Sequence, residues 1–168
     1  MAEPRTDAEK REHLRELIKG FRTAMFVTRT PSGALRARPL AIADNRAEDL
    51  YFATSMDSPK VKEIEADPHV NVCMQDADQF VSLSGTARIA TDRELIDKMW
   101  SEAWKVWFPQ GKDDPALCLV VVDVLDAEYW DQSGAKGLRY LFDAAKAYVT
   151  GTPLQSPSDE AQNAKIRI

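Results

Sequence analysis

The amino-acid sequence predicts a mainly β protein, a small antiparallel barrel of about six strands, closed or nearly so, with helices on its outside. Three observations carry this prediction. Short runs of alternating apolar and polar residues follow one another from residue 23 to residue 131, separated by turn-forming residues. One late run, 117–125, is almost wholly apolar, as expected of a central strand. Stretches with helical apolar spacing stand before, between and after these runs.

Apolar residues at helical spacing predict an N-terminal helix over about 7–20, which Gly20 can end. The barrel should then occupy about 23–131. Its strands are expected at 24–29, 34–43, 49–54, 70–75 and 80–90, and from residue 117 through Trp130. We expect the short turn at 44–48 to pair the second strand with the third.

Helices are also expected over 58–66, from the capping box at 91–94 through Trp107, and over about 136–150. The sequence shows no internal repeat and no clear linker. We therefore predict a single domain over residues 1–151. A polar, loose tail is expected over residues 152–168.

The composition is that of an ordinary globular protein, with 44% hydrophobic and 29% charged residues. The net charge of −5 argues against broad nucleic-acid binding. No apolar run is long enough to cross a membrane and no signal peptide is visible, so a cytoplasmic protein is expected. No His or Cys residues stand at metal-ligand spacing, so no metal site is expected. Cys73 and Cys118 lie in apolar strand patterns and are interpreted as buried structural thiols.

The segment between the third strand and the next helix offers a candidate anion site. Ser58 and Pro59 are explained by a helix start alone. Lysines in the first turn are not, because the helix dipole disfavours each of them by about 0.3–1 kcal/mol. A phosphate could be held there by hydroxyl, amine and backbone N–H groups, with side chains from Thr54, Ser55, Ser58, Lys60 and Lys62. The alternative is a capped helix whose lysines point into water.

A second candidate is the segment LRARPLAIAD, residues 35–44. Arg36 and Arg38 are two positions apart and share one face of a strand. Pro39 has no N–H group, which favours a sheet edge. If the second and third strands pair as expected, Arg38 lies toward Thr54 and adds a cation to the same site. The alternative is a pair of exposed arginines on an edge strand.

The tryptophans form a third group of candidates. Trp100, Trp104 and Trp107 have the spacing of one helix face, and packing on the barrel is the first interpretation. Trp107 and Phe108 end that helix and lead into a loop. Trp130 closes the last strand, where it could cover a planar ligand or simply lie at the rim.

Together these segments resemble a known family. They are, in chain order, Arg38-Pro39-Leu40, YFATSMDSPKVKEIEADPHVNV, LSGTARI, WKVWFPQGKDDP and VDVLDAEYWD. They are similar to the FMN-binding split-barrel proteins of the pyridoxamine 5′-phosphate oxidase-like superfamily, and within it to the general stress protein type. The resemblance covers about residues 8–151. It implies a six-stranded split β-barrel that forms a homodimer, with FMN in a groove at the subunit interface.

The resemblance also implies roles for individual residues. The phosphate end of FMN would be contacted from the second strand and the strand–helix element, at Arg38, Thr54, Ser58 and Lys60, and Ser55 is a further cofactor-binding candidate. Backbone along the isoalloxazine ring would come from Pro39, Leu40, Phe52 and Ala53. Trp130 matches a late aromatic residue that approaches the flavin from the partner subunit. Trp107 and Phe108 are expected to line the pocket.

Two departures from the family pattern bear on function. True pyridoxamine phosphate oxidases carry an Arg-containing segment after the late Trp, and commonly an Arg at the position of Pro59. This chain has neither, so that activity is disfavoured and FAD becomes an alternative to FMN. The expected function is a stress-related, flavin-dependent oxidoreductase that acts on an unknown small molecule. The alternatives are a non-catalytic protein that binds or stores flavin or another phosphorylated cofactor, and a barrel that has lost its cofactor. No residue stands out as a catalytic acid or base.

Overall fold

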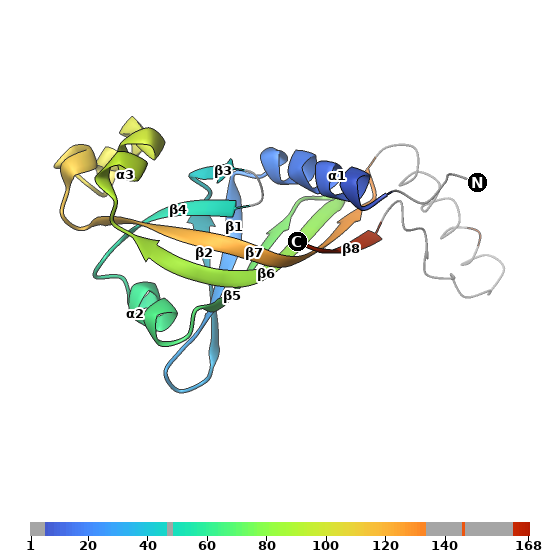
Figure 1. Ribbon diagram of the computed structural model, residues 1–168, viewed down its shortest axis with the longest axis horizontal. Helices are drawn as coiled ribbons and strands as arrows, with labels where there is room; N and C mark the ends of the chain where they lie inside the picture. The colour runs from blue at the N-terminus through green and yellow to red at the C-terminus, as the bar shows by residue number, and fades with distance from the viewer. Residues whose placement is uncertain (1–5, 47–48, 134–145, 147–162) are drawn as a thin grey trace.

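The computed structural model describes residues 6–46, 49–133, 146 and 163–168. In this part of the chain, one antiparallel sheet curls on itself and carries helices on its outside (Figure 1). The predicted fold class is confirmed. The elements are α1 Asp7–Gly20, β1 Thr23–Arg29, β2 Leu35–Ala41, β3 Asp44–Arg46, β4 Asp49–Ser55, α2 Pro59–Ala66, β5 His69–Gln75, β6 Gln79–Ala90, α3 Arg93–Met99, the 3-10 helices η1 Glu102–Val106 and η2 Gly111–Asp113, β7 Leu117–Asp131 and β8 Asn163–Arg167.

The sheet has eight strands in the described residues, rather than the six expected. Its main order is β2-β1-β5-β6-β7-β4-β3, and β8 pairs separately with β7. The two additional strands are short. Asp44–Arg46 was expected to be part of a turn, but its backbone pairs with β4, with Asn45 opposite Leu50. Strands of three and five residues are too short for an alternating pattern to reveal them in the sequence.

The expected pairing of the second strand with the third is wrong. Strand β2 pairs along its whole length with β1, with Pro39 opposite Met25. Pro39 does lie on an edge strand, as predicted, because β2 ends the strand order. After β2 the chain crosses to the other end of the sheet, where the Ala43 N–H donates a 2.7 Å hydrogen bond to the Tyr51 carbonyl. This crossing brings the two ends of the curled sheet together.

Strand β7 is central, as its apolar run predicted. It pairs with β6 on one side and with β4 on the other over residues 117–122, and both of its faces are buried there. A register shift lies at Ser84/Gly85 in β6, opposite β7. A Cβ atom at residue 85 would stand 2.1 Å from the Asp123 carbonyl oxygen, so only glycine allows the strands to approach so closely.

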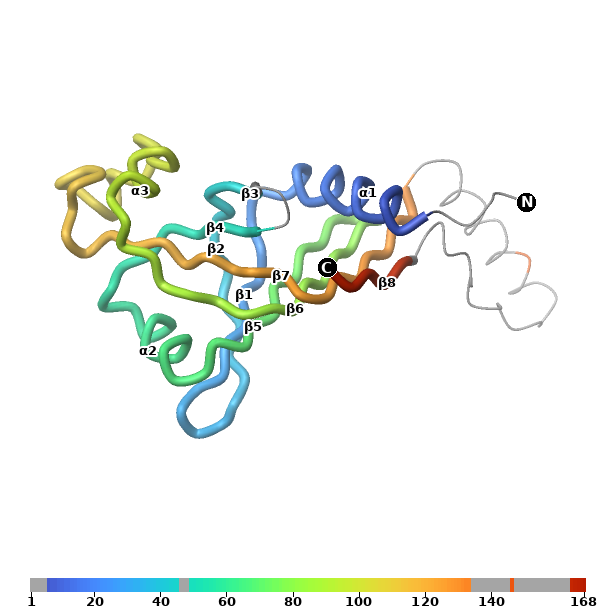
Figure 2. Tube along the Cα trace, viewed as in Figure 1, coloured from blue at the N-terminus to red at the C-terminus, as the bar shows by residue number. Residues whose placement is uncertain are grey.

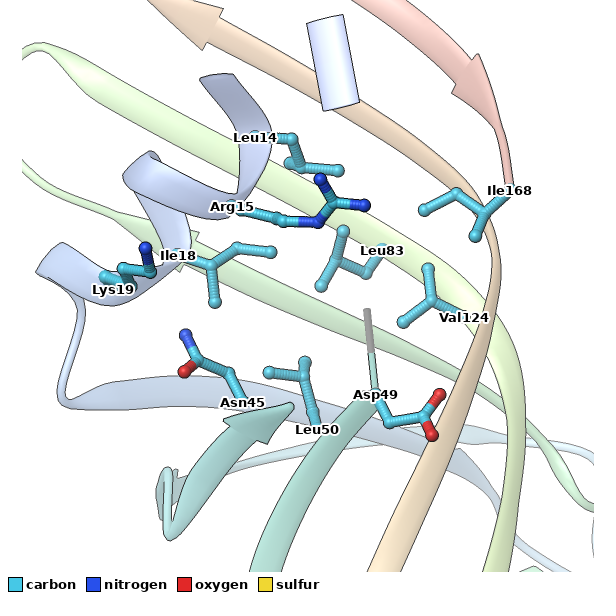
Figure 3. Close-up of a pocket in the computed structure, with 10 residues that line it drawn as sticks. All are labelled: Leu14, Arg15, Ile18, Lys19, Asn45, Asp49, Leu50, Leu83, Val124 and Ile168. Carbon is cyan, nitrogen blue, oxygen red and sulfur yellow. The ribbon is translucent and has the colours of Figure 1, made fainter. Parts of the chain in front are cut away.

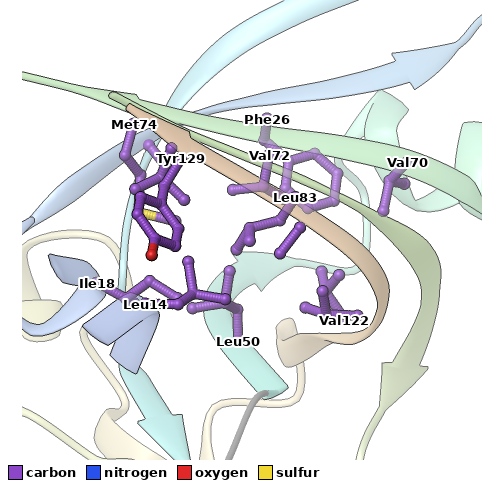
Figure 4. Close-up of a cluster of buried hydrophobic side chains, with 14 of the residues drawn as sticks. Leu14, Ile18, Phe26, Leu50, Val70, Val72, Met74, Leu83, Val122 and Tyr129 are labelled. Carbon is purple, nitrogen blue, oxygen red and sulfur yellow. The ribbon is translucent and has the colours of Figure 1, made fainter. Parts of the chain in front are cut away.

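The main core lies inside the curl of the sheet, under α1. Leu14 and Ile18 of α1 belong to the same buried cluster as Leu50 of β4, and Figure 4 shows the three side chains facing one another. Phe26 and Phe52 meet edge to face at 5.3 Å in this cluster. The predicted helix over 7–20 therefore begins and ends as expected and packs its apolar face on the sheet. Its start is a capping box between Thr6 and Glu9.

A second buried cluster lies under α3, on the opposite face of β7, and includes Leu117, Leu119 and Val121. The helix predicted from the capping box through Trp107 is interrupted here. It ends at Met99, and η1 follows after Trp100, whose backbone is extended. Trp100 and Trp104 meet edge to face at 5.7 Å, and both pack against this cluster. The predicted packing role of these two side chains is therefore confirmed, although the helix that carries them is interrupted.

The expectation of a loose tail is wrong for the end of the chain. Residues 163–167 form β8, which pairs with the second half of β7, from Asp126 opposite Arg167 to Trp130 opposite Asn163. Figure 2 shows this segment beside β7, at the end of the molecule away from α3. Ala164 and Ile166 are buried in the main core. The helix expected over 136–150 lies outside the described residues except for residue 146.

A small cavity of about 120 Å³ separates α1 from the sheet. Figure 3 shows Leu83, Val124 and the C-terminal Ile168 pointing toward this space. Ligand pockets have volumes of roughly 300–1,000 Å³, so this cavity is a packing gap. None of the described helices has the length and apolar character needed to cross a membrane.

Candidate functional site

A groove of about 600 Å³ opens between the curled sheet and the 3-10 segment, a volume suited to a cofactor-sized ligand. One wall is the β2 edge strand with Pro39 and Leu40, and another is the end of β4. Trp104, Trp107 and Phe108 form the aromatic wall. Trp107 is 69% exposed, whereas Phe108 is buried. The groove therefore has an apolar floor and an exposed aromatic ring at its margin.

The polar groups of this groove are hydroxyls and backbone atoms. The described side chains that line it are apolar, aromatic or hydroxylic, and none of them titrates near neutral pH. Thr54 and Ser55 stand at the end of β4, where the strand turns toward α2. This lining suits a flat, uncharged ring system better than a charged one.

Lys60 lies directly behind Thr54. Its Nζ atom donates hydrogen bonds to Thr54 Oγ1 at 2.8 Å and to Ser58 Oγ at 2.6 Å. Ser58 stands at the helix start, as predicted, but its hydroxyl does not cap the helix because it accepts from Lys60 instead. Burial, followed by the charge of Arg38, lowers the pKa of Lys60. Lys60 is therefore a partly buried cation whose two hydrogen-bond partners here are neutral hydroxyl groups.

Arg38 belongs to a buried ionic network one helical turn away. Its Nη2 atom donates to Glu63 Oε2 at 2.7 Å and to Thr28 Oγ1 at 2.9 Å. Arg36 donates to the other carboxylate oxygen of Glu63 at 2.9 Å. Burial alone would raise the pKa of Glu63, but hydrogen bonds from Thr28 and Arg38, with the charges of Arg38 and Arg36, shift this pKa downward overall. Glu63 is thus an ionised carboxylate.

One atom of this network has no partner. Arg38 Nη1 is buried and makes no hydrogen bond to any of the described residues. The cluster contains three cations, Arg36, Arg38 and Lys60, and the single carboxylate of Glu63. A buried donor without a partner and an excess of positive charge are both relieved by a bound anion. These residues fit a phosphate group at the end of the groove.

The structure brings most of the predicted site residues together. Seven of them line the groove: Pro39, Leu40, Ala53, Thr54, Ser55, Trp107 and Phe108. Lys60 and Ser58 reach the groove through Thr54, and Arg38 lies in the adjoining network. Arg38 contacts Glu63 and Thr28 rather than Thr54, because β2 pairs with β1. Lys62, the other lysine in the first turn of the helix, is exposed and is not part of the cluster.

Two predicted residues lie apart from the groove. The side chain of Phe52 is fully buried in the main core, so only its backbone is available to a ligand. Trp130 lies near the far end of β7, opposite Asn163 of β8. Leu117, at the groove end of β7, is thirteen residues before Trp130 on the same strand. Trp130 does not line the groove of its own chain.

Sequence reasoning missed Glu63, Thr28 and Trp104. Glu63 stands between apolar residues on the buried face of α2, and a carboxylate on such a face is the signal that could have indicated a buried ion pair. Its partners come from β1 and β2, and only the tertiary structure reveals them. Trp104 was interpreted as a packing residue alone, but it also lines the groove.

The two cysteines differ from each other. Cys118 is fully buried beside Thr54, as predicted, and burial raises the pKa of its thiol to about 11. Cys73 is half-buried, so the prediction of a buried thiol is wrong there. Its Sγ atom lies 2.8 Å from Asn71 Oδ1, on the outer face of β5. Side chains on that face remain partly accessible to solvent.

Comparison with known proteins identifies the family of this chain. Residues 9–155 match the family model described as pyridoxamine 5′-phosphate oxidase like. The chain belongs to this family. The matched segment includes the groove, the cationic cluster and most of the sheet. Its members among the solved structures include split-barrel proteins, which confirms the predicted resemblance.

Three relatives show the range of similarity within this family. General stress protein 26 of Bacillus subtilis is 37% identical over 82 residues, which are 46% of this chain and 58% of that protein. A putative general stress protein 26 from Jannaschia sp. CCS1 has a TM-score of 0.73 and 25% identity, over 96% of this chain and 99% of its own. The general stress FMN/FAD binding protein of Xanthomonas citri has a TM-score of 0.66 and 26% identity, over 76% of this chain and 92% of its own.

Proposed function

We propose that this protein binds FMN, with the isoalloxazine ring in the groove and the phosphate at the cationic cluster. One observation carries the proposal: Thr54 lines the apolar groove and also accepts a hydrogen bond from Lys60, so the groove and the cluster are continuous. The described relative from Xanthomonas citri, an FMN/FAD binding protein by name, supports the same ligand class. FAD, which has a diphosphate in place of the phosphate monoester, is the alternative cofactor.

We propose further that the bound flavin makes the protein an oxidoreductase for a small molecule. The flavin supplies the chemistry, because it exchanges a hydride or electrons at its ring. The protein would orient the ring between the β2 edge and the aromatic wall and hold its phosphate. The described groove lining offers no acid or base of its own. The same observation favours the second candidate, a flavin-binding protein without catalysis.

A homodimer is part of this proposal. Trp130 matches an aromatic residue that approaches the flavin in related proteins. It lies near the end of β7 and does not line the groove of its own chain. A second copy could supply it. Two exposed apolar side chains, Leu35 and Leu125, line one surface hollow. They are 72% and 49% exposed, which supports an interface there.

The purified protein tests the proposal directly. A yellow protein with flavin absorption bands, or a colourless one that takes up added FMN with an affinity in the micromolar range or better, is expected. A protein that neither carries flavin nor binds added FMN would contradict both candidate functions. Stopped-flow mixing of the flavin-loaded protein with NADH or NADPH then separates them. Bleaching of the flavin bands supports the oxidoreductase, and unchanged bands favour the binding protein.

Replacement of Lys60 tests the phosphate assignment. Lys60→Ala should weaken FMN binding about tenfold and riboflavin binding little, because a charge-assisted hydrogen bond contributes about 1.5–3 kcal/mol and only FMN carries the phosphate. Lys62→Ala removes an exposed lysine from the same helix and serves as the matched control. Fluorescence titration with both flavins measures the difference. Equal losses for FMN and riboflavin would contradict the assignment.

A further inference from the structure

Glu63 has a position that the phosphate site alone does not explain. It is an acid, 4% exposed, next to a cluster whose proposed ligand is an anion. At close range in a partly buried site, a like charge opposes the ligand by several kcal/mol at most and never assists it through Coulomb forces. A negative charge at this place therefore needs a different role.

The contacts of Glu63 identify that role. Each carboxylate oxygen accepts a hydrogen bond from an arginine: Oε1 from Arg36 and Oε2 from Arg38. The Thr28 hydroxyl also donates to Oε2, at 2.5 Å. Arg38 Nη2 is thereby held by both Glu63 and Thr28. This contact fixes the plane of the guanidinium group, because its nitrogen atoms are coplanar. The remaining Nη1 atom is buried and has no partner among the described residues.

The helix sets where Arg38 is held. Glu63 follows Lys60 by three residues on α2, so both side chains project from the same face, one turn apart. The Arg38 guanidinium, bound to Glu63, is accordingly close enough for its charge to act on Lys60. An anion bound at Lys60 Nζ would therefore be near the Arg38 guanidinium group, whose Nη1 atom has no partner among the described residues.

We propose that Glu63 is a positioning residue: it holds Arg38 through Nη2 so that Nη1 is presented to the phosphate beside Lys60. This inference rests on the proposed function for the identity of the anion. The role of Thr28 follows from it, since the Thr28 hydroxyl links the same two groups. Glu63 itself does not touch the ligand.

Two possible roles for Glu63 predict opposite changes in anion affinity when Glu63 is replaced by Gln. If its charge acts only as part of the local field, Glu63→Gln should tighten anion binding, because a negative charge is removed. If it positions Arg38, the same variant should weaken binding, because the amide holds the guanidinium poorly. Glu65→Gln is the matched control: it removes the same charge from an exposed site on the same helix, two residues away. We expect it to change FMN affinity by less than about twofold, toward tighter binding.

The experiment measures the affinities of FMN, riboflavin and inorganic phosphate for the wild-type protein and each variant. Glu63→Gln is expected to weaken FMN and phosphate about tenfold and to leave riboflavin within about twofold. Thr28→Val keeps nearly the same shape and all charges, and is expected to weaken FMN about threefold. In Glu63→Gln, Arg38 loses its buried counter-charge, which can prevent folding. Thr28→Val then provides the test instead.

The outcomes distinguish this inference from the proposed function. Tighter phosphate binding by Glu63→Gln, or equal losses of FMN and riboflavin, would overturn the positioning role. So would a wild-type protein to which phosphate does not bind at all, or unchanged FMN binding by Thr28→Val. If the wild-type protein takes up no flavin but binds phosphate, and Glu63→Gln weakens that binding, the proposed function fails and the positioning role stands.

Discussion

Lys60 is the residue at which ligand binding should depend on pH. Its pKa lies below the usual 10.5 because of burial and the nearby charge of Arg38. The protonated amine holds the phosphate, so FMN affinity should fall as the pH rises through this pKa. The thiol of Cys118, with a pKa raised to about 11, stays neutral over most of this range. At lower pH, FMN affinity should increase as the pH increases through about 6, because the phosphate then loses its second proton.

Fluorescence titrations from about pH 5 to pH 10 measure this dependence. Riboflavin, which has the same ring and no phosphate, is the control ligand and should show neither limb. Lys60→Ala should lose the alkaline limb and keep the acidic one. An alkaline limb that persists in this variant would assign the titration to another group.

Trp107 should act on the ring of the ligand and not on the phosphate. It lines the groove but is 69% exposed, so little of the protein's stability depends on it. Stacking of an aromatic side chain on a heteroaromatic ring contributes about 1–3 kcal/mol. Trp107→Ala should therefore weaken FMN and riboflavin equally, by about tenfold, with an unchanged free energy of unfolding.

Val106→Ala is the matched control for Trp107. Val106 is 75% exposed, adjoins Trp107 and does not line the groove. Its replacement should change neither affinity. A loss confined to FMN in Trp107→Ala would show that the indole acts near the phosphate, contrary to its place in the groove.

At the scale of elements, β8 is the part of the fold that makes the C-terminal residues structural. Ile166 is 3% exposed and packs in the main core. Ile166→Ala should lower the free energy of unfolding by about 2–4 kcal/mol, since it removes buried methylene groups and leaves a cavity. Lys165→Ala alters the exposed neighbour and should stay within about 0.5 kcal/mol. Urea denaturation measures both, and equal midpoints for the two variants would contradict the docking of β8.

The longer elements could be predicted from sequence because each has a strong local signal. Helix α1 has an apolar face and a capping box, and β7 has a continuous apolar run. The helix predicted through Trp107 failed because the spacing of the tryptophans suits one continuous helix face. In the structure, Trp100 and Trp104 pack against the cluster under α3 from an interrupted chain. Strands β3 and β8 carry too few apolar residues for local pattern to show them.

For the whole molecule, the position of Trp130 makes a prediction about assembly. If Trp130 covers the flavin, we expect it to do so from a second copy, because it does not line the groove of its own chain. The protein should have a mass in solution of twice the 18.8 kDa of the chain. Light scattering coupled to gel filtration measures this mass. A monomer that binds FMN would contradict the proposed place of Trp130.

Replacement of Trp130 completes that test. Trp130→Ala should weaken FMN and riboflavin alike, in the dimeric protein, by about fivefold or more. Phe80 pairs with Trp130 on the neighbouring strand, so Phe80→Leu is a control for local disturbance of the sheet. It should leave both affinities within about twofold if only Trp130 meets the ligand.

The sequence by itself determined the fold class, the family resemblance and most of the groove residues, because these depend on local pattern. The strand–helix segment from Thr54 to Lys60 forms its contacts within six residues, so its chemistry was readable. Only the tertiary structure decided that Arg38 is held by Glu63 and Thr28. It also decided that Trp130 does not line the groove of its own chain. Both depend on which strands are neighbours. Strand order is set by long-range burial and backbone pairing, which no local pattern in the chain encodes.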